Sequence, residues 1–225
     1  MLSWSSALVT TNISEAIPKG LIASIVMEYL PSLISTVAVL ICKSILGESA
    51  MLEYFLGIDP SATSTGLTLL GSDGSCEVHL IKPRKLRDCA RLQYINRDIK
   101  SFISNKHITL CVYESPSYGS THKEFILGEV LGVIKLTVSS LGIPMVGSAP
   151  TQLKKYLTGS GRASKQSVIE HAVKLGCTSN QEDICDSYAA ALLCKDIVKG
   201  PLLNTRSSRE VRTTLIGKHP LLGYK

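Results

Sequence analysis

The chain has 225 residues, of which 44% are hydrophobic, so it can bury one sizeable core and still carry appended segments. Its net charge is +6, and residues 1–50 hold only two of the 24 basic side chains. The rest of the chain is therefore basic enough to bind a polyanionic partner such as nucleic acid. Many proteins without such a partner reach the same charge. The seven cysteines include no C-x-x-C pair, which argues against a zinc site or redox motif and indicates a reducing, intracellular compartment.

Residues 1–50 differ in pattern from the rest of the chain. The segment 21–42 is largely apolar and long enough to span a bilayer, but Glu28 and Pro31 interrupt it. Three interpretations stay open: an interfacial or partner-binding helix pair, a weak membrane anchor, or sequence outside the functional protein. We favour the last over a membrane contact, because Met51 stands just before the first predicted strand, where a native start is expected.

From residue 51 the pattern becomes that of an α/β domain, predicted to extend to about residue 200. Strands are predicted over 54–59, 66–70 and 76–81, with an Asp-Gly turn that indicates a hairpin between the last two. An apolar run over 108–114 predicts a strand buried on both faces, as in parallel pairing with the first strand.

Helices are predicted where apolar residues recur at spacings of three and four. They cover 86–105, 122–141, 150–157, 163–175 and 182–198, with a short strand over 142–146. The element order predicts a mixed five-stranded sheet flanked by helices. After Gly200-Pro201 the pattern is lost, and the basic tail 201–225 is expected to be mobile or to contact DNA.

Four carboxylates stand where they can converge. The first and fourth predicted strands end on Asp59 and Glu114, and the last predicted helix opens with Asp183 and Asp186, which share one helix face. If the helix crosses the carboxyl ends of two neighbouring strands, the acids meet and need divalent cations such as Mg²⁺ or Mn²⁺. Taken alone, each acid could be a turn former or a solvated helix start, but their joint occurrence favours a metal site.

The motifs around these acids resemble those of the RuvC family of Holliday-junction resolvases, which has a ribonuclease-H-like fold. The resemblance rests on G-I-D-P-S…T-G, V-Y-E-S-P and D-I-C-D-S-Y-A-A-A-L, and it covers about residues 53–198. It implies that the four acids bind two Mg²⁺ ions per active site, with Mn²⁺ as a substitute. It also implies that Lys154 and Lys165, eleven residues apart, hold the scissile phosphate, unless they are merely solvated. Arg162, in the same basic loop as Lys165, is expected to contact DNA.

The sequence departs from the family at one position. The bacterial proteins place an aromatic residue three positions after the strand-end glutamate, where it helps to open the junction by stacking. Here Ser117 occupies that position and Tyr118 comes next. Tyr118 either takes over this role by a shift of one residue or the wedge is absent, which leaves the preference at the cut site open.

The resemblance implies a cytoplasmic, homodimeric crossover junction endodeoxyribonuclease, in the host cytoplasm if phage-encoded, with the apolar helix 122–141 as a candidate interface. One alternative keeps the fold but cuts flaps, other branched DNA or RNA–DNA hybrids. Another is ATP binding, because G-I-D-P-S-x-T-S-T-G also resembles the phosphate hairpin of actin-like ATPases and sugar kinases; the further motifs that those proteins need are not found. The four intact acids argue against a non-catalytic DNA-binding protein.

Overall fold

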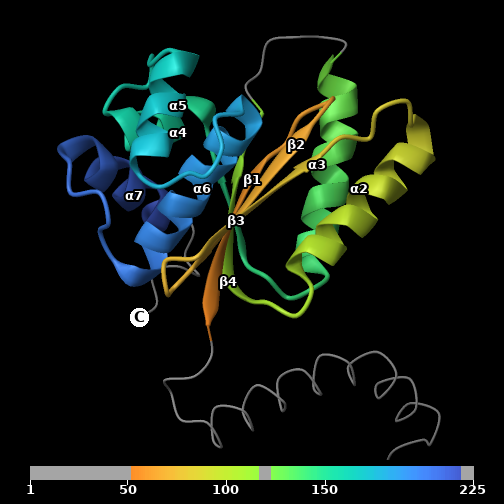
Figure 1. Cartoon of the computed structure of the whole chain (residues 1–225), viewed down its shortest axis with the longest axis horizontal. Coiled ribbons are helices and arrows are strands. Elements are labelled where there is room, and N and C mark those ends of the chain that lie inside the picture. The colour runs from red at the N-terminus through yellow and green to blue at the C-terminus, as the bar shows by residue number, and fades with distance from the viewer. Residues whose placement is uncertain (1–51, 117–122, 219–225) are drawn as a thin grey trace, which may run out of the picture. The chain divides into compact units, whose positions relative to one another are not determined.

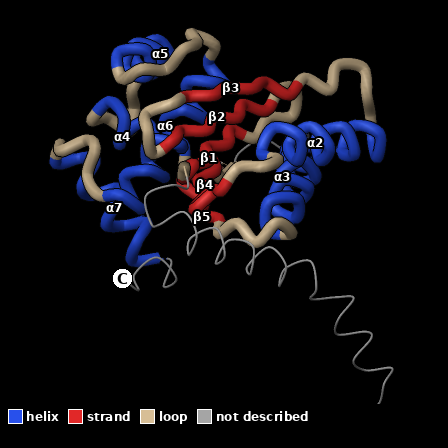
Figure 2. Tube along the Cα trace, turned by 60° about the horizontal axis from the view of Figure 1, so that its bottom comes forward, coloured by secondary structure: helices blue, strands red, loops and turns tan. Residues whose placement is uncertain are grey.

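Five strands form one mixed sheet in the computed structural model, which describes residues 52–116 and 123–218 (Figures 1 and 2). The strands are β1 (Glu53–Asp59), β2 (Thr65–Gly71), β3 (Cys76–Ile81), β4 (His107–Glu114) and β5 (Met145–Ser148). They lie in the order β3-β2-β1-β4-β5, as Figure 2 shows. The first three pair antiparallel, and β4 lies parallel to both β1 and β5. The predicted mixed five-stranded sheet is therefore confirmed.

Six helices of the described chain cover the two faces of this sheet. They are α2 (Asp88–Ile103), α3 (Lys123–Ser139), α4 (Pro150–Thr158), α5 (Lys165–Lys174), α6 (Glu182–Lys199) and α7 (Arg206–Lys218). Helices α2 and α3 lie on one face, and α4 to α7 lie on the other, as Figures 1 and 2 show. Helix α6 packs directly on β1, β2 and β4.

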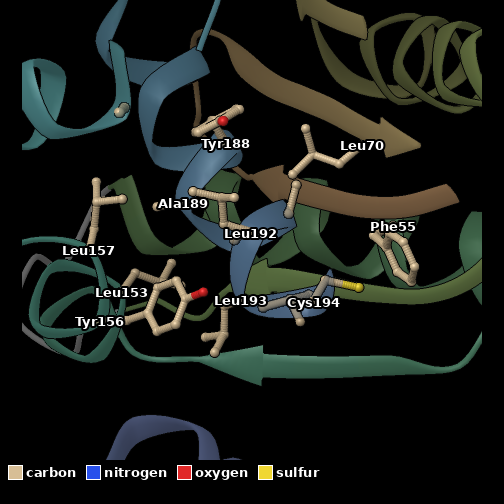
Figure 3. Packing of buried hydrophobic residues seen from close by; sticks show 14 of the residues in the cluster. Phe55, Leu70, Leu153, Tyr156, Leu157, Tyr188, Ala189, Leu192, Leu193 and Cys194 are labelled. Atoms are coloured by element: carbon tan, nitrogen blue, oxygen red, sulfur yellow. The ribbon is translucent and has the colours of Figure 1, made fainter. Parts of the chain in front are cut away.

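The alternation of side chains along the strands gives each face its own hydrophobic core. In β1, Leu56 and Ile58 join the core under α2 and α3, whereas Phe55 joins the core under α6. Figure 3 shows the second core, where α6 contributes Leu192 and Leu193 beside the buried residues of α4. The two cores together hold the sheet between its two helix layers.

Two predictions for the second half of the chain need correction. The strand predicted over 142–146 begins at Met145, because Gly142, at a φ of 72°, ends α3 in a turn first. No helix is predicted within the tail 201–225, which is expected to be mobile or to contact DNA, but residues Arg206–Lys218 form α7. Val211 and Leu215 of α7 are buried at 3% and 1% exposure in the core beside α4. Helix α7 is thus packed on the rest of the α/β unit.

Some predictions fall outside the described residues. They concern residues 1–50, including the membrane contact through 21–42, and Tyr118. Within the part of the chain that the structure describes, no helix has the length and hydropathy that crossing a membrane requires.

Candidate active site

The pleat of the sheet directs Asp59 and Glu114 toward α6. Asp59 follows Phe55 by four residues in β1, and Glu114 follows Val112 by two in β4, so each acid shares a strand face with a residue of the α6 core. The two strands are parallel neighbours with Ile58 opposite Tyr113, which places the two acids side by side at the carboxyl edge. The predicted convergence of the strand-end acids is thus present in the fold.

Two glycines let α6 lie against the strand backbone. A Cβ atom added to Gly57 would lie 2.0 Å from the Ser187 carbonyl oxygen, and one added to Gly66 would lie 2.0 Å from the Asp183 carbonyl oxygen. Both distances are far below a normal contact, so only glycine fits at either position. Because Gly66 is opposite Asp59 in the β1–β2 ladder, this close approach brings the first turn of α6 to the strand-end acid.

Hydrogen bonds fix the helix over the strands. The Ser64 hydroxyl, in the loop between β1 and β2, donates to Oδ2 of Asp183. One turn further along α6, the buried hydroxyls of Thr68 and Ser187 are 2.8 Å apart. Ser64 is a site residue that the sequence reasoning missed, because a serine in a turn of small residues carries no signal of its own until the helix above it is placed.

Burial and mutual repulsion raise the pKa values of the clustered acids. Burial, followed by the charges of Glu114, Asp186 and Asp183, raises the pKa of Asp59 well above its usual value. Burial, followed by the charge of Asp186, raises the pKa of Glu114 to about 7. Burial, followed by the charge of Glu182, raises the pKa of Asp186 to about 6. These groups repel one another across a shared space, as expected for a site that takes cations.

Glu182 is a fifth acid at this site, and the sequence reasoning did not assign it. It begins α6 one residue before Asp183, and its charge raises the pKa values of Asp59, Glu114 and Asp186. Its Oε1 atom lies 2.6 Å from Nζ of Lys165. The signal was available in the sequence, since Glu182 adjoins the D-x-x-D motif, but an acid at a helix start has a sufficient explanation in the helix dipole.

The two predicted lysines reach the acids from α4 and from the start of α5. The charge of Lys154, a half-buried residue of α4, lowers the pKa values of Glu114 and Asp186 against the upward shifts. Lys165 is 72% exposed in its side chain and pairs with Glu182. Arg162 is exposed in the loop between these helices. The structure therefore brings both lysines to the acids and leaves Arg162 open to solvent.

The residues present fit a divalent cation. Asp59 is only 8% exposed, and within residues 52–116 and 123–218 its carboxylate has no ion pair or hydrogen bond. No group of three or more described His, Cys, Asp and Glu side chains forms a ready-made metal cage. Mg²⁺ is usually coordinated by one or two carboxylates together with waters and substrate oxygens. An open cluster of acids is compatible with this coordination.

Comparison with known proteins places this arrangement in a family. The model of the crossover junction endodeoxyribonuclease RuvC matches residues 55–194, which include the four predicted acids and both lysines. The chain belongs to the RuvC family. The RuvC protein of Neorickettsia sennetsu is 31% identical over 147 residues, which are 60% of this chain and 89% of that protein. The RuvC protein of Rhodopirellula baltica is 30% identical over 158 residues, which are 65% and 88%.

A solved RuvC structure supports the same fold. The structure of Thermus thermophilus RuvC in complex with a Holliday junction substrate superposes with a TM-score of 0.53 at 21% identity. The match covers 63% of this chain and 90% of the Thermus chain. The ribonuclease-H-like fold implied by the sequence motifs is thereby confirmed.

Proposed function

We propose that this protein is a metal-dependent endonuclease that resolves four-way DNA junctions by paired, symmetric nicks. The observation that carries the proposal is the set of acids at the carboxyl edge of β1 and β4, crossed by the start of α6, in a chain of the RuvC family. The D-x-x-D start of α6 supports this proposal over ATP binding, because an ATP-binding fold would leave these two acids unexplained.

The chain supplies the site with ligands and with cations for phosphate. Asp59, Glu114, Asp183 and Asp186 would hold two Mg²⁺ ions, with Mn²⁺ as a substitute, and bound ions of this kind activate water and stabilise the leaving oxygen in phosphodiester hydrolysis. Lys154 lies close enough to the acids to alter their pKa values, so its ammonium group can neutralise a phosphate bound there. Lys165 would exchange its partner, leaving Glu182 for the scissile phosphate.

The direct test is the substitution Asp59→Asn, which keeps the shape of the side chain and removes its charge. We expect it to abolish Mg²⁺-dependent cutting of a synthetic four-way junction while the variant still binds the junction in a gel-shift assay. The matched control is Asp98→Asn, which alters an α2 carboxylate that pairs with His79 away from the site. Full cutting activity in Asp59→Asn would overturn the proposed role of the acids.

The substrate preference is tested on the wild-type protein with three DNA forms. A mobile four-way junction should be cut at opposed positions, and a flap and an RNA–DNA hybrid of matched length should be cut at least tenfold more slowly. Equal cutting of the flap or the hybrid would assign the same site to a different substrate.

The role of Tyr118 is tested by replacing it with Phe and with Ala. Cutting of junctions that differ in sequence at the cut site then shows whether an aromatic ring at this position acts as the wedge.

We infer a homodimer, because two symmetric cuts require two active sites. The apolar residues of α3 that point away from the core support this inference, since Phe125 is 81% exposed and Leu136 is 71% exposed. Large exposed apolar side chains on one helix are typical of a surface that a partner covers. A second copy of this chain is the occupant that the paired cuts require.

We further infer that the nuclease unit begins near residue 51 and acts in the cytoplasm. The described cysteines are all free, which suits a reducing compartment such as the cytoplasm.

The start of the nuclease unit is tested with a variant that begins at Met51, which should cut the junction as fast as the full chain. A loss of cutting or binding in that variant would instead give residues 1–50 a part in the enzyme.

A further inference from the structure

Helix α7 lies beyond the residues that the family match covers. The match ends at residue 194, whereas α7 begins at Arg206. Helix α7 packs on α4, which carries Lys154, and on α6, which carries Asp183 and Asp186 (Figures 1 and 2). It therefore contacts both of the helices whose separation sets the distance from Lys154 to these acids.

A buried carboxylate connects α7 to the end of α6. Burial raises the pKa of Asp196, which is 1% exposed, while the Leu202 N–H, the Tyr156 hydroxyl and the Arg212 guanidinium lower it. The Leu202 N–H donates to Oδ1 of Asp196. Tyr156 belongs to α4 and Arg212 to α7, so groups from both helices face this acid. A buried acid needs such partners, and the three helices are therefore held together at one point.

Two polar contacts connect α7 to α4. Nζ of Lys155 lies 2.8 Å from Oε1 of Glu210. The Ser207 hydroxyl donates to the carbonyl oxygen of Gly159 at 3.2 Å. Gly159 ends α4 in the left-handed conformation, at a φ of 87°, where the chain turns into the loop toward α5. The contacts thus hold α4 at the residue next to Lys154 and at its carboxyl end.

The polar contacts of α7 with α4 are too exposed to matter much for folding. The side chains of Lys155 and Glu210 are 35% and 57% exposed, and ion pairs at such positions add little to stability. Val211 and Leu215, which are buried, already fix α7 to the core. The rate of a reaction, by contrast, depends strongly on where a charged group lies beside the reacting phosphate. The contacts are therefore better suited to setting the position of α4 than to stabilising the fold.

We propose that α7 positions Lys154 opposite the acids, with Glu210 and Ser207 as the positioning residues. Both act through α4, and neither acts by contact with the DNA or the metal ions. Because α7 contacts α6 as well, it fixes the gap between the acids and Lys154 into which a phosphate must fit. The proposal rests on the proposed nuclease function.

The test is a charge swap between α4 and α7, measured as the single-turnover rate constant for cutting a four-way junction in Mg²⁺ at saturating protein. Lys155→Glu and Glu210→Lys each place like charges together, so α4 shifts, and we expect each to lower the rate constant about tenfold. The combined variant Lys155→Glu/Glu210→Lys restores an opposite pair and should cut within about twofold of wild type. The two single variants change the net charge in opposite directions. A rate constant that falls in one and rises in the other would therefore overturn the proposal in favour of a general charge effect.

Further variants separate positioning from misfolding. All three variants should melt within about 2 °C of wild type, because the pair is exposed. Ser207→Ala, which changes no charge, should lower the rate constant about threefold and leave the junction affinity in EDTA unchanged. The matched control is Lys199→Glu, which places like charges together beside Glu53 at the opposite end of β1 from Asp59 and should cut at the wild-type rate.

The outcomes distinguish this proposal from the nuclease function. Single variants that cut as fast as wild type, or a swap that melts like wild type but restores nothing, would refute positioning by α7 and leave the nuclease function standing. A wild-type protein that cuts no branched DNA would refute the nuclease function itself.

Discussion

The two faces of the sheet are packed by different means. On one face, Gly57 and Gly66 bring the α6 backbone into contact with β1 and β2, and the alanines of α6 keep that distance short. On the other face, long aliphatic side chains such as Ile95 and Ile134 separate α2 and α3 from the strands. The first face holds the start of α6 close to the strand-end acids, and the second face leaves apolar side chains of α3 exposed.

The largest effect is expected from filling the close approach on the α6 face. In Gly66→Ala, the new Cβ would meet the Asp183 carbonyl oxygen at 2.0 Å, so the start of α6 must shift. We expect a loss of about 3 kcal/mol in the free energy of unfolding, at the upper end for overpacking, and no junction cutting. Gly132→Ala on α3, where a Cβ meets nothing within 4 Å, should leave stability unchanged or raise it by about 1 kcal/mol. Similar denaturation midpoints for the two variants would contradict the contrast between the faces.

A comparable effect on stability, without the direct loss of cutting, tests whether α7 belongs to the packed unit on the α6 face. Leu215 is 1% exposed, so Leu215→Ala should lower the free energy of unfolding by about 2–4 kcal/mol, as measured by urea denaturation. Leu202→Ala, at a residue that is 45% exposed, should change it by less than about 0.5 kcal/mol. A midpoint for Leu215→Ala that matches wild type would make α7 an appendage, as the sequence pattern suggests.

Helix α7 shows where sequence patterns stop being informative. Its buried positions Ser208, Val211 and Leu215 have a helical spacing, but charged and polar residues surround them and one of the three is a serine. The sequence does contain a helix-start signal, namely Thr205 and Ser208 three residues apart. In the structure the side chain of each accepts a hydrogen bond from the backbone N–H group of the other, at 3.0 and 3.1 Å. Two buried apolar residues in a helix of 13 are too few for periodicity to indicate a helix.

The convergence of the four candidate acids, in contrast, could be predicted from local sequence patterns. Apolar runs that end on Asp59 and Glu114 mark strand ends, and the D-x-x-D start of an Ala-rich helix marks one helix face, so local patterns and chain order were sufficient. Glu182 and Ser64 were not identified, because their roles depend on which loop or helix lies opposite them. Only the tertiary fold brings Lys165 to Glu182 and the Ser64 hydroxyl to Asp183.

An intermediate effect is expected from removing the buried charge of Glu114, whose pKa is raised by burial first and by the charge of Asp186 second. Because the pKa of Glu114 is raised to about 7 in the folded protein, the metal-free protein should lose stability as the pH rises from about 4.5 to 7. Glu114→Gln removes this cost, so in EDTA at pH 8 it should be about 2 kcal/mol more stable than wild type, and at about pH 4 the difference should vanish.

Two comparisons make this pH experiment decisive. Glu170→Gln, at an exposed residue of α5, should keep the wild-type pH profile throughout. Added Mg²⁺ should raise the melting temperature of the wild type at about pH 8 and raise that of Glu114→Gln much less, because the variant lacks one charged ligand. A Glu114→Gln protein that is less stable than wild type at this pH in EDTA would contradict a raised pKa for Glu114 in the folded state.

The smallest effect on folding, and the sharpest on assembly, is expected on the α3 face. Leu136 is 71% exposed, so Leu136→Lys should change the monomer's free energy of unfolding by less than about 0.5 kcal/mol. If α3 is the dimer interface, however, a buried lysine without a partner there should convert dimer to monomer in sedimentation velocity at micromolar concentration. Leu202→Lys, an equivalent change on the α6 face, should leave the dimer intact. If Leu136→Lys still sediments as a dimer, α3 is not the dimer interface, and another partner must explain its exposed apolar residues. The two faces of the sheet would then differ in packing but not in a role in assembly.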